Sequence, residues 1–322
     1  MKKKIKALVL LSGGLDSILA TKLLQKQGLE VEAVAFSTPF FDTSKARKAA
    51  SQLKVKLLTK NITKNFWSIL KNPLFGYGKN MNPCIDCHIL MIKEAAKIMK
   101  KIGAHFIATG EVLEERPFSQ NKKALEQVAK HSGLSGLLLR PLSAKLLPPT
   151  LVEEKGWVKR ENLLNLSGRS RKRQIALAKK WKITNYPQPA SGCLLTDPGY
   201  ASRLNELSIK NKNFTPLDAE LIKHGRIFWE DAVLILIGRN QTDNQEVKRL
   251  AQGQDLLMEA KDFKGPLTLI RNFSSSKIDK KVLKKAAYLT AIYGKGRNQK
   301  EVEVVYQNLS CKDKTFSIKV KL

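Results

Sequence analysis

The sequence predicts an α/β protein with a parallel sheet, followed by a smaller α+β domain. Two observations support this prediction. In the first 200 residues, short apolar runs alternate with helix-like segments at close intervals, which is typical of right-handed βαβ units and a parallel sheet. From about residue 214 the order changes, and several strand-like runs surround one long helical segment. We therefore expect two domains, residues 1–200 and residues 215–322.

The elements of the first domain follow from their apolar patterns. Unbroken apolar runs are typical of strands that are buried on both faces of a parallel sheet. Strands are predicted at residues 5–11, 31–37, 55–62 and 105–111, and helices at 16–24, 44–53, 84–103 and 169–182. Ligands of such sheets bind at the carboxyl ends of the strands. We therefore expect the SGG turn after the first strand, Phe36 and the TGE turn after the fourth strand to converge.

The second domain has a different order of elements. Strands are predicted at residues 232–240, 266–273, 301–306 and 315–322, with one helix at 280–294. This order is typical of an α+β domain, in which strands pair with each other directly.

The composition points to a polyanionic partner. The 322 residues include 58 Lys and Arg against 28 Asp and Glu, for a formal net charge of +30, which favours binding to nucleic acid. A basic surface dispersed over the molecule would give the same total. The segment Arg169–Lys182 argues for clustering, because it holds seven basic residues, no acid and an apolar side. Its candidate RNA-binding residues are Arg169, Arg171, Arg173, Lys179 and Lys180.

Other composition signals bear on location. Basic amphipathic helices also bind membrane surfaces, but the sequence has no apolar run long enough to span a bilayer. The N-terminal MKKKIKALVLL resembles a signal peptide, yet SGGLDS follows where a cleavage site is expected. We interpret the segment as the first strand and expect a cytoplasmic protein.

The turn between the first strand and the first helix predicts a phosphate site. Ser12, Gly13, Gly14, Asp16 and Ser17 lie within six residues. Two glycines allow a sharp turn that points several N–H groups at one spot, and a helix N-terminus adds a partial positive charge there. An ordinary turn with a helix cap explains only one glycine and one polar residue. No Gly-Lys-Ser/Thr follows, so the turn is not a P-loop.

Four cysteines are present, and three of them suggest a site. Cys84 and Cys87 form a CxxC just before a predicted helix, whose N-terminus we expect to lower their pKa values. Cys193 lies more than a hundred residues later. Three kinds of site fit: zinc with His88 or Cys311 as fourth ligand, a redox pair with Cys193 as a core residue, or an iron–sulfur cluster on three thiolates. Spacing alone slightly favours zinc.

Several motifs together resemble known families. SGGLDS resembles the PP-loop of ATP pyrophosphatases, which have an adenine nucleotide alpha-hydrolase-like fold. TGEVLEERPFSQ at residues 109–120 and LRPL at 139–142 resemble tRNA 4-thiouridine synthetases. PCIDC at 83–87 and PASGC at 189–193 resemble cluster-bearing members of the tRNA thiolation group.

The resemblance implies an AMP-forming tRNA sulfurtransferase that uses ATP and Mg²⁺. Ser12, Gly13, Gly14, Asp16 and Ser17 would surround the phosphates, Phe36 and Gly110 would line the adenosine site, and Gln120 would add a contact. A tRNA uridine would be adenylated on a carbonyl oxygen, and sulfur would then displace AMP. Cys84, Cys87 and Cys193 would hold a [4Fe-4S] cluster, with zinc as the alternative, or Cys193 would carry a persulfide. The sulfur donor would be sulfide or a cysteine desulfurase persulfide.

The C-terminal part resembles a second family, the NFACT-R RNA-binding module. The blocks IGRNQTDN, GQDLLMEA, GPLTLIR, KKAAYLTAIYGKGR and VEVVY follow in its order over residues 231–320. The resemblance makes Arg239, Lys295 and Arg297 candidate phosphate contacts.

Several functions stay open on the sequence. The TGE, SQ and RPL motifs favour 4-thiouridine at tRNA position 8, and a 2-thiouridine synthetase is the first alternative. A different PP-loop adenylating enzyme with a zinc site, and a non-catalytic RNA-binding factor, are the others.

Overall fold

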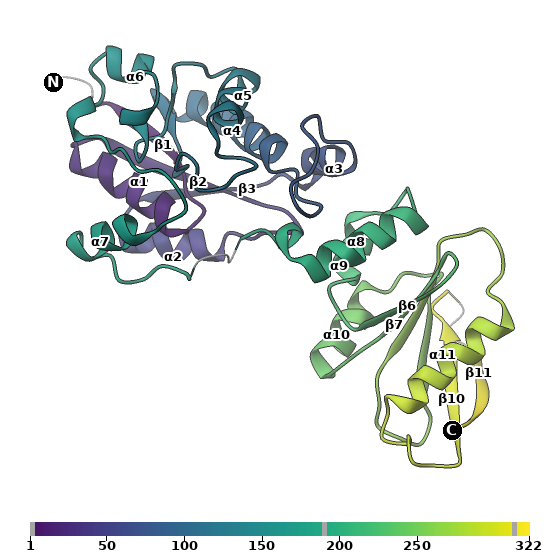
Figure 1. The fold of residues 1–322 in the computed structure, drawn as a ribbon. Helices are drawn as coiled ribbons and strands as arrows, with labels where there is room; N and C mark the ends of the chain where they lie inside the picture. The colour runs from purple at the N-terminus through teal and green to yellow at the C-terminus, as the bar shows by residue number, and fades with distance from the viewer. Residues whose placement is uncertain (1–3, 189–191, 311–313) are drawn as a thin grey trace. The chain divides into compact units, whose positions relative to one another are not determined.

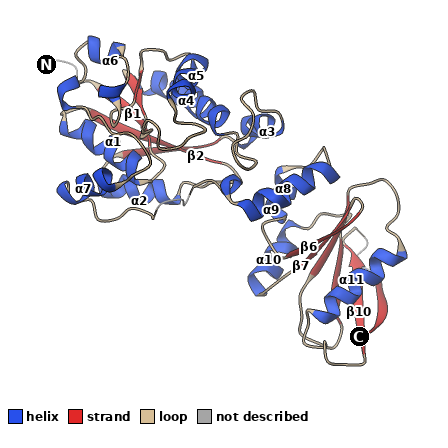
Figure 2. Cartoon of the chain, in the orientation of Figure 1, coloured by secondary structure: helices blue, strands red, loops and turns tan. Residues whose placement is uncertain are grey.

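The computed structural model describes residues 4–188, 192–310 and 314–322. The chain forms two compact units, Met1–Asp197 and Pro198–Leu322, each shown in Figures 1 and 2. The second unit begins ahead of residue 215, the start expected from the sequence, because the helix at residues 198–210 is hydrogen-bonded to the helix that follows residue 215. Two sequence positions of interest, the PAS segment ahead of Gly192 and Cys311, lie outside the described residues.

The N-terminal unit is built on a five-stranded sheet with the order β3-β2-β1-β4-β5, in which every pairing is parallel. The prediction of a parallel α/β sheet is therefore confirmed. The strands are β1 (Lys6–Leu10), β2 (Glu30–Ser37), β3 (Lys56–Asn61), β4 (Phe106–Ala108) and β5 (Leu138–Leu139). β1 is central, which explains its apolar sequence, because both its faces are covered.

Helices cover both faces of this sheet. The main helices are α1 (Leu15–Lys26), α2 (Ser44–Leu53), α3 (Thr63–Lys71), α4 (Cys84–Ile102), α5 (Lys122–Ser132) and α7 (Lys172–Lys180). α1 and α2 lie on one face and α4 and α5 on the other (Figure 1). The shorter elements are α6 (Leu151–Glu154) and the 3-10 turns Ala144–Leu146, Arg160–Asn162 and Leu194–Thr196. Apolar residues of β1 and α1, such as Val9 and Ile18, are fully buried in the core between these layers.

The C-terminal unit has a six-stranded antiparallel sheet with the order β11-β10-β8-β9-β7-β6. Its strands are β6 (Arg226–Glu230), β7 (Val233–Ile237), β8 (Leu256–Ala260), β9 (Thr268–Asn272), β10 (Glu301–Asn308) and β11 (Thr315–Lys321). Its helices are α8 (Pro198–Lys210), α9 (Pro216–Leu221), α10 (Gln241–Leu250) and α11 (Lys280–Ile292). The expected α+β character of this part is confirmed.

A buried ion cluster fixes the helices of this unit to its sheet. Ile270 of β9 packs in the core beneath α11, and the next side chain, Arg271, faces the opposite side of the sheet. The Arg271 guanidinium bonds Asp218 of α9 at 2.6 Å and Asp255 at 2.6 Å, and all three side chains are buried. α8, which precedes residue 215, is held in turn to α9, because Tyr200 Oη donates to the Ala219 carbonyl at 2.7 Å. The unit therefore includes chain on both sides of residue 215.

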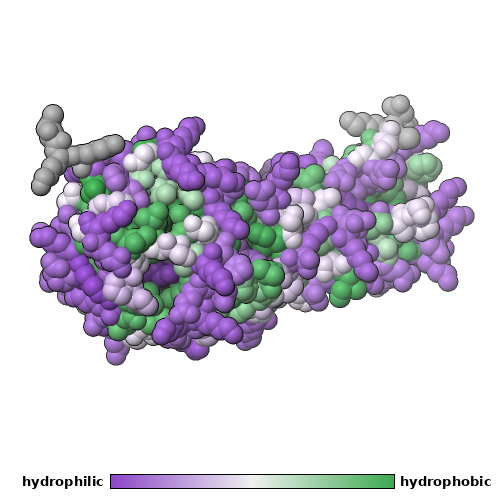
Figure 3. Space-filling view, turned by 90° about the horizontal axis from the view of Figure 1, so that it is seen from above, coloured by the Kyte–Doolittle hydropathy of each residue, from purple (hydrophilic) through white to green (hydrophobic). Residues whose placement is uncertain are grey.

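The surface is strongly polar. Hydrophilic residues cover most of the face seen in Figure 3, and apolar residues gather in smaller areas, in keeping with the net charge of +30. Among the helices of the described residues, none is long and apolar enough to cross a membrane.

Candidate active site of the N-terminal unit

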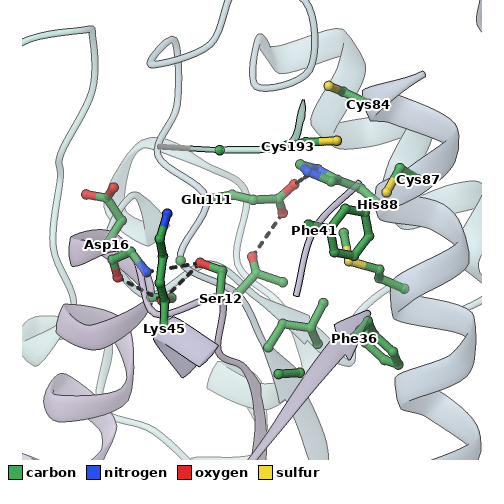
Figure 4. A pocket seen from close by; sticks show the side chains of 18 of the residues that line it. Ser12, Asp16, Phe36, Phe41, Lys45, Cys84, Cys87, His88, Glu111 and Cys193 are labelled. Carbon is green, nitrogen blue, oxygen red and sulfur yellow. Dashed lines mark hydrogen bonds and ion pairs between the residues drawn. The ribbon is translucent and has the colours of Figure 1, made fainter. Parts of the chain in front are cut away.

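One pocket of about 530 Å³ lies at the carboxyl ends of β1, β2 and β4. Its lining comes from the SGG turn, the end of β2, the TGE turn and the first turn of α4, as Figure 4 shows. The sequence-predicted residues that line it are Ser12, Gly14, Asp16, Ser17, Phe36, Cys84, Cys87, Gly110, Gln120, Arg171 and Cys193. The structure thus brings together residues that are up to 181 positions apart in the chain (Ser12 and Cys193).

The SGG turn is closed by its own hydroxyl groups. The Gly14 N–H donates to Ser12 Oγ at 3.3 Å, and Ser17 Oγ donates to the Gly14 carbonyl at 2.8 Å. Gly13 has a positive φ of 81°, and a Cβ there would lie 2.4 Å from the Lys45 carbonyl carbon. Gly13 therefore lets the turn pack against the Lys45 backbone, and it does not line the pocket. The N–H groups of the first turn of α1, which begins at Leu15, have no partners within the helix and are suited to an anion.

The TGE turn packs directly on the start of α1. A Cβ added to Gly110 would lie 2.5 Å from the Ser17 backbone nitrogen, a distance at which only glycine fits. This contact is the reason that the two turns meet at one site, and it makes Gly110 a packing requirement of the pocket as well as part of its lining.

Charged groups gather beside Asp16. Burial raises the pKa of Asp16, and the positive charges of Arg171 and Arg116 oppose this shift. Burial together with the Asp16 charge raises the pKa of Glu115 to about 7. All four side chains line the pocket, so two carboxylates and two guanidinium groups face the same space next to the SGG turn.

Three polar atoms in this region are buried without a hydrogen-bond partner among the described residues. They are Asp16 Oδ1, Gln120 Oε1 and Arg171 Nε, and their residues all line the pocket. Buried polar atoms are normally paired. These unpaired atoms therefore indicate a site that a polar ligand completes.

Glu111 is the centre of a buried network between the turn and α4. Its carboxylate accepts hydrogen bonds from Thr109 Oγ1 at 2.9 Å and Arg140 Nε at 2.8 Å, and His88 Nδ1 lies 2.9 Å from its other oxygen. Burial by itself raises the pKa of Glu111, but the Arg140 charge and the His88 hydrogen bond outweigh burial and hold this pKa well below its usual range. Glu111 is thus a fixed anion that orients His88.

The cysteines lie on the other side of the pocket from Asp16. Figure 4 shows Cys84, Cys87 and Cys193 around the same part of the cavity, with His88 near them. The two cysteine segments are joined by a hydrogen bond from Asn80 Nδ2 to the Thr196 carbonyl at 2.8 Å. The Leu194 N–H donates to the Phe40 carbonyl at 2.9 Å, which ties the Cys193 segment to the chain after β2. The Cys84 sulfur accepts a hydrogen bond from Asn82 at 3.2 Å.

The prediction that the helix N-terminus lowers the pKa of Cys87 is wrong. Burial raises the pKa of Cys87 well above its ordinary value, and the charges of Cys193 and Cys84 add to the shift. Burial likewise raises the pKa of Cys193 to about 12. In the part of the chain that the structure describes, no three His, Cys, Asp or Glu side chains are close enough to bind one metal ion. As placed, the three thiols are not a preformed single-ion zinc site, since zinc needs sulfur at about 2.3 Å from the metal.

The predicted basic residues divide into two groups. Arg171 lines the pocket, whereas Arg169, Arg173, Lys179 and Lys180 do not. The Arg173 guanidinium donates to the Asn165 side chain at 2.6 Å. Sequence reasoning also did not select Lys45, Glu115 and Arg116, which line the pocket. Glu115 and Arg116 lie within TGEVLEERPFSQ, and their adjacent opposite charges between the TGE and SQ motifs were the available signal.

The C-terminal unit has a polar pocket of its own. Arg239, Lys295 and Arg297 line it together with Lys264 and Tyr293. The Arg239 guanidinium is held by Asp243 at 2.6 Å, which lowers the pKa of that carboxyl well below its usual range. The Arg226 guanidinium lies 4.5 Å from the ring centroid of Tyr293. The three predicted phosphate contacts are therefore grouped around one hollow beside an aromatic ring.

The parallel sheet and the SGGLDS turn ahead of its first helix define the N-terminal unit as a PP-loop α/β domain. Residues 3–145 match the family model described as "Thiamine biosynthesis protein (ThiI)", and residues 225–321 match "NFACT protein RNA binding domain". The chain thus matches a ThiI family model over its PP-loop domain and an NFACT RNA-binding family model over its C-terminal part. Both family resemblances inferred from the sequence are confirmed.

Curated relatives match parts of the chain. The tRNA-specific 2-thiouridylase MnmA of Sulfurimonas denitrificans is 35% identical over 124 residues, which cover 35% of this chain and 36% of that protein. MnmA of Ruthia magnifica is 31% identical over 171 residues, 46% of each chain. A probable tRNA sulfurtransferase of Thermococcus kodakarensis is 33% identical over 144 residues, which cover 42% of this chain and 36% of that protein. The chain thus spans less than half the length of these relatives.

Proposed function

We propose that this protein is an ATP-dependent tRNA sulfurtransferase that replaces a carbonyl oxygen of a uridine with sulfur. The observation that carries the proposal is the placement of a PP-loop and three thiols around one pocket. Ser12 and Asp16 stand at one end, and Cys84, Cys87 and Cys193 stand at the other. A reaction that needs both ATP cleavage and sulfur accounts for both ends.

In the first step, the site would bind ATP with Mg²⁺. The N–H groups of the SGG turn and of the first turn of α1 suit the β- and γ-phosphates, and Asp16 is the candidate metal ligand beside them. The apolar part of the lining, which includes Phe36 and Phe41, suits the adenosine. The uridine oxygen would attack the α-phosphorus, so that the O–P bond forms as the bond to pyrophosphate breaks. The loop and the metal would stabilise the charge that develops.

In the second step, sulfur would displace AMP from the activated carbon. The C–S bond forms as the C–O bond breaks, and AMP leaves with the former uridine oxygen. Three thiols that face one pocket fit a cluster with an open iron by their donor chemistry; such a cluster on Cys84, Cys87 and Cys193 would supply a binding place for sulfide. The alternative carrier is a persulfide on Cys193, formed by a cysteine desulfurase. Its outer sulfur would bond to the carbon as AMP leaves, a second thiol such as Cys84 or Cys87 would break the S–S bond and form a disulfide with Cys193, and an external thiol reductant would restore both thiols.

The product we favour is 4-thiouridine at tRNA position 8, on the ThiI-type match of the PP-loop domain. A 2-thiouridine is the second candidate, because the matched relatives include proteins named tRNA-specific 2-thiouridylase. The NFACT-type domain and the basic face of α7 would bind the tRNA backbone, so affinity should fall steeply with salt. The target base must leave its stack to reach a pocket of this depth.

The test is a thiolation assay with protein that is purified without oxygen. Unmodified tRNA, ATP, Mg²⁺ and sulfide are added, and the digested nucleosides are identified by mass spectrometry. We expect 4-thiouridine, and we expect it to disappear in Asp16→Ala and in Cys193→Ala. The fourth cysteine provides the matched control, since Cys311→Ala should retain the wild-type level of product. A 2-thiouridine product would keep the chemistry and change the target.

A second assay uses the same preparation. Iron and acid-labile sulfide are measured in the wild type and in Cys84→Ala, Cys87→Ala and Cys193→Ala. Iron and sulfide that are lost in all three variants would support the cluster. Zinc at one ion per chain would instead favour a different adenylating enzyme. A cluster-loaded protein that makes no thiolated nucleoside would sink the proposed function.

A further inference from the structure

Arg116 lies on a loop whose backbone is unusually well fixed. The loop is closed by hydrogen bonds from the Glu114 N–H to the Gln120 carbonyl at 2.9 Å and from the Gln120 N–H to the Arg116 carbonyl at 2.8 Å. Glu114 has a left-handed φ of 60°, and Pro117 restricts the backbone of the residue before it. The position of the Arg116 Cα is therefore set in advance, although its side chain is exposed.

The same loop is attached to the segment that carries Arg171. Leu113 and Ser167 form a parallel bridge, and the Gly168 N–H donates to the Leu113 carbonyl at 2.8 Å. The Leu113 N–H donates to Ser143 Oγ at 2.9 Å, which in turn donates to the Leu166 carbonyl at 2.7 Å. These hydrogen bonds join the loop that carries Arg116 to the segment that leads to Arg171, and both arginines line the pocket.

The guanidinium of Arg116 lies between the two chemical ends of the pocket. A Cβ added to Gly192 would be 4.0 Å from Arg116 Nη1, so the group is beside the residue that precedes Cys193. The Arg116 charge also opposes the rise that burial causes in the pKa of Asp16, so the same side chain acts on the phosphate end of the pocket. Arg171 acts on Asp16 as well, but the position beside Gly192 belongs to Arg116. We therefore place Arg116 between the phosphate end and the cysteine end of the pocket.

In the proposed reaction, one group of the substrate must lie between the phosphate end and the cysteine end of the pocket. Pyrophosphate departs toward the SGG turn, and sulfur arrives from the side of the cysteines, so the α-phosphoryl group and the uridine oxygen bonded to it lie between them. This inference rests on the proposed function. We propose that Arg116 is a catalytic residue that donates hydrogen bonds to a non-bridging oxygen of the α-phosphoryl group in both steps.

The chemistry favours an arginine at this place. A guanidinium presents several N–H donors in a fixed plane, which matches the oxygens of a phosphoryl group. In the first step it opposes the negative charge that grows as the uridine oxygen bonds to phosphorus. In the second step it stabilises AMP as the C–O bond to the base breaks. Such donors act most strongly when they are placed before the reaction begins, and the closed loop fixes the backbone position from which the Arg116 side chain reaches the pocket.

The test compares Arg116→Met with Arg116→Lys and Arg171→Met in single-turnover reactions with saturating tRNA. We expect Arg116→Met to slow tRNA-dependent pyrophosphate release by about 100- to 1,000-fold, with ATP affinity changed only a few-fold. Arg116→Lys should recover part of the rate. Arg171→Met should mainly weaken ATP binding. Lys123→Met, an exposed cation at the start of α5, is the matched control and should react like the wild type.

A substitution in ATP makes the test specific for the contact. In the two diastereomers of ATP with sulfur on the α-phosphorus, a different non-bridging oxygen is replaced. One diastereomer should slow the wild type strongly, and the same replacement should have little further effect in Arg116→Met, because the contact is already lost. Equal effects in the two proteins would overturn the assignment of Arg116.

The outcomes separate the two proposals. A wild-type protein that thiolates tRNA, together with Arg116→Met at the wild-type rate, would remove only the role of Arg116. A wild-type protein that releases no pyrophosphate with any tRNA would remove the proposed function and this role with it. Urea unfolding of each variant shows whether a lost rate reflects lost folding.

Discussion

The imidazole Nδ1 of His88 lies 2.9 Å from a carboxylate oxygen of Glu111, and the other Glu111 oxygen accepts a hydrogen bond from Arg140. This contact joins the helix that carries Cys84 and Cys87 to the turn that follows β4. It therefore helps to fix the position of α4, which carries two of the cysteines, relative to the TGE turn, which packs on the PP-loop. Glu111 has one of the lowest exposures of any ionisable side chain at the site, 6%.

The first prediction concerns this link. Glu111→Gln should lower the free energy of unfolding by about 3 kcal/mol, because it leaves the buried Arg140 without its anion. The measurement is urea unfolding at pH 7. Glu246→Gln is the control: it breaks the exposed pair with Arg249 and should leave the transition where it is. A Glu111→Gln protein as stable as the wild type would show that Arg140 finds another partner.

The second prediction uses two neighbouring glycines. Gly13→Ala should lower the free energy of unfolding by about 2–3 kcal/mol and abolish nucleotide binding, since it combines a positive φ with a contact of 2.4 Å to the Lys45 backbone. Gly14→Ala meets only Ser12 Oγ at 3.5 Å and should fold normally. Calorimetric titration with ATP and thermal unfolding measure the two effects. If Gly13→Ala and Gly14→Ala had the same ATP affinity and the same thermal stability, the left-handed conformation of Gly13 would not be required for nucleotide binding.

The third prediction concerns thiol reactivity. Because burial raises the pKa of Cys193 to about 12 and the pKa of Cys87 well above its ordinary value, both thiols should be almost fully protonated at pH 8. Iodoacetamide should therefore modify Cys193 at least ~100-fold more slowly than free cysteine, and it should also modify Cys87 more slowly than free cysteine. Mass spectrometry of the metal-free protein follows both reactions. The same protein in urea serves as control and should react at the ordinary rate. Rapid modification of the folded protein would mean that the site opens.

The fourth prediction concerns the pocket of the C-terminal unit. The double variant Lys295→Gln/Arg297→Gln should bind tRNA more weakly and reduce the slope of log K against log salt by about 1.4–1.8, since two phosphate contacts are lost. Fluorescence anisotropy at several salt concentrations measures both quantities. Lys281→Gln/Lys284→Gln removes the same charge from α11, away from this pocket, and should change the slope less. An equal loss from both pairs would indicate a dispersed basic surface instead.

The fifth prediction is a pH dependence. The pKa of Glu115 is raised to about 7, above its ordinary value, so the folded state keeps a proton that the unfolded state releases as the pH rises from 4.5 to 7. Stability from this group is therefore lost across that window. Glu115→Gln should leave stability unchanged near pH 4 and raise it above pH 7, by roughly 1 kcal/mol because Glu115 is partly exposed. Unfolding at several pH values tests this. An equal gain at both ends would exclude the mechanism.

Much of the fold follows from local patterns. The apolar runs of β1 and β2 and the alternation with helices predict a parallel sheet, because a strand buried on both faces must be apolar throughout. Elements with weaker patterns were not predicted, among them α3, α5 and α10. α10 in particular is strongly polar in sequence, so that its helix depends on packing against the sheet and on its Asn240 cap.

The candidate site divides in the same way. SGGLDS and CxxC are contiguous, so that the chemistry of phosphate and of sulfur is visible from residue order alone. Arg116 was not selected although it lies between the TGE and SQ motifs, and Arg171 was assigned to RNA. In the structure both line the pocket, and the bridge between Leu113 and Ser167 joins their two segments. The order of residues does not say how close in space two segments lie when they are far apart in the chain.

By itself, the sequence determined the class of the sheet, the PP-loop, the pair of domain families and the residues that suit ATP and sulfur. The tertiary structure decided that these residues face one pocket, that Glu111 and Arg140 are buried beside the half-buried His88, and that Cys87 is buried and Cys193 half-buried. The physical reason is that local conformation depends on neighbours along the chain. Burial, by contrast, and the pKa values that follow from it, depend on which distant segments pack together.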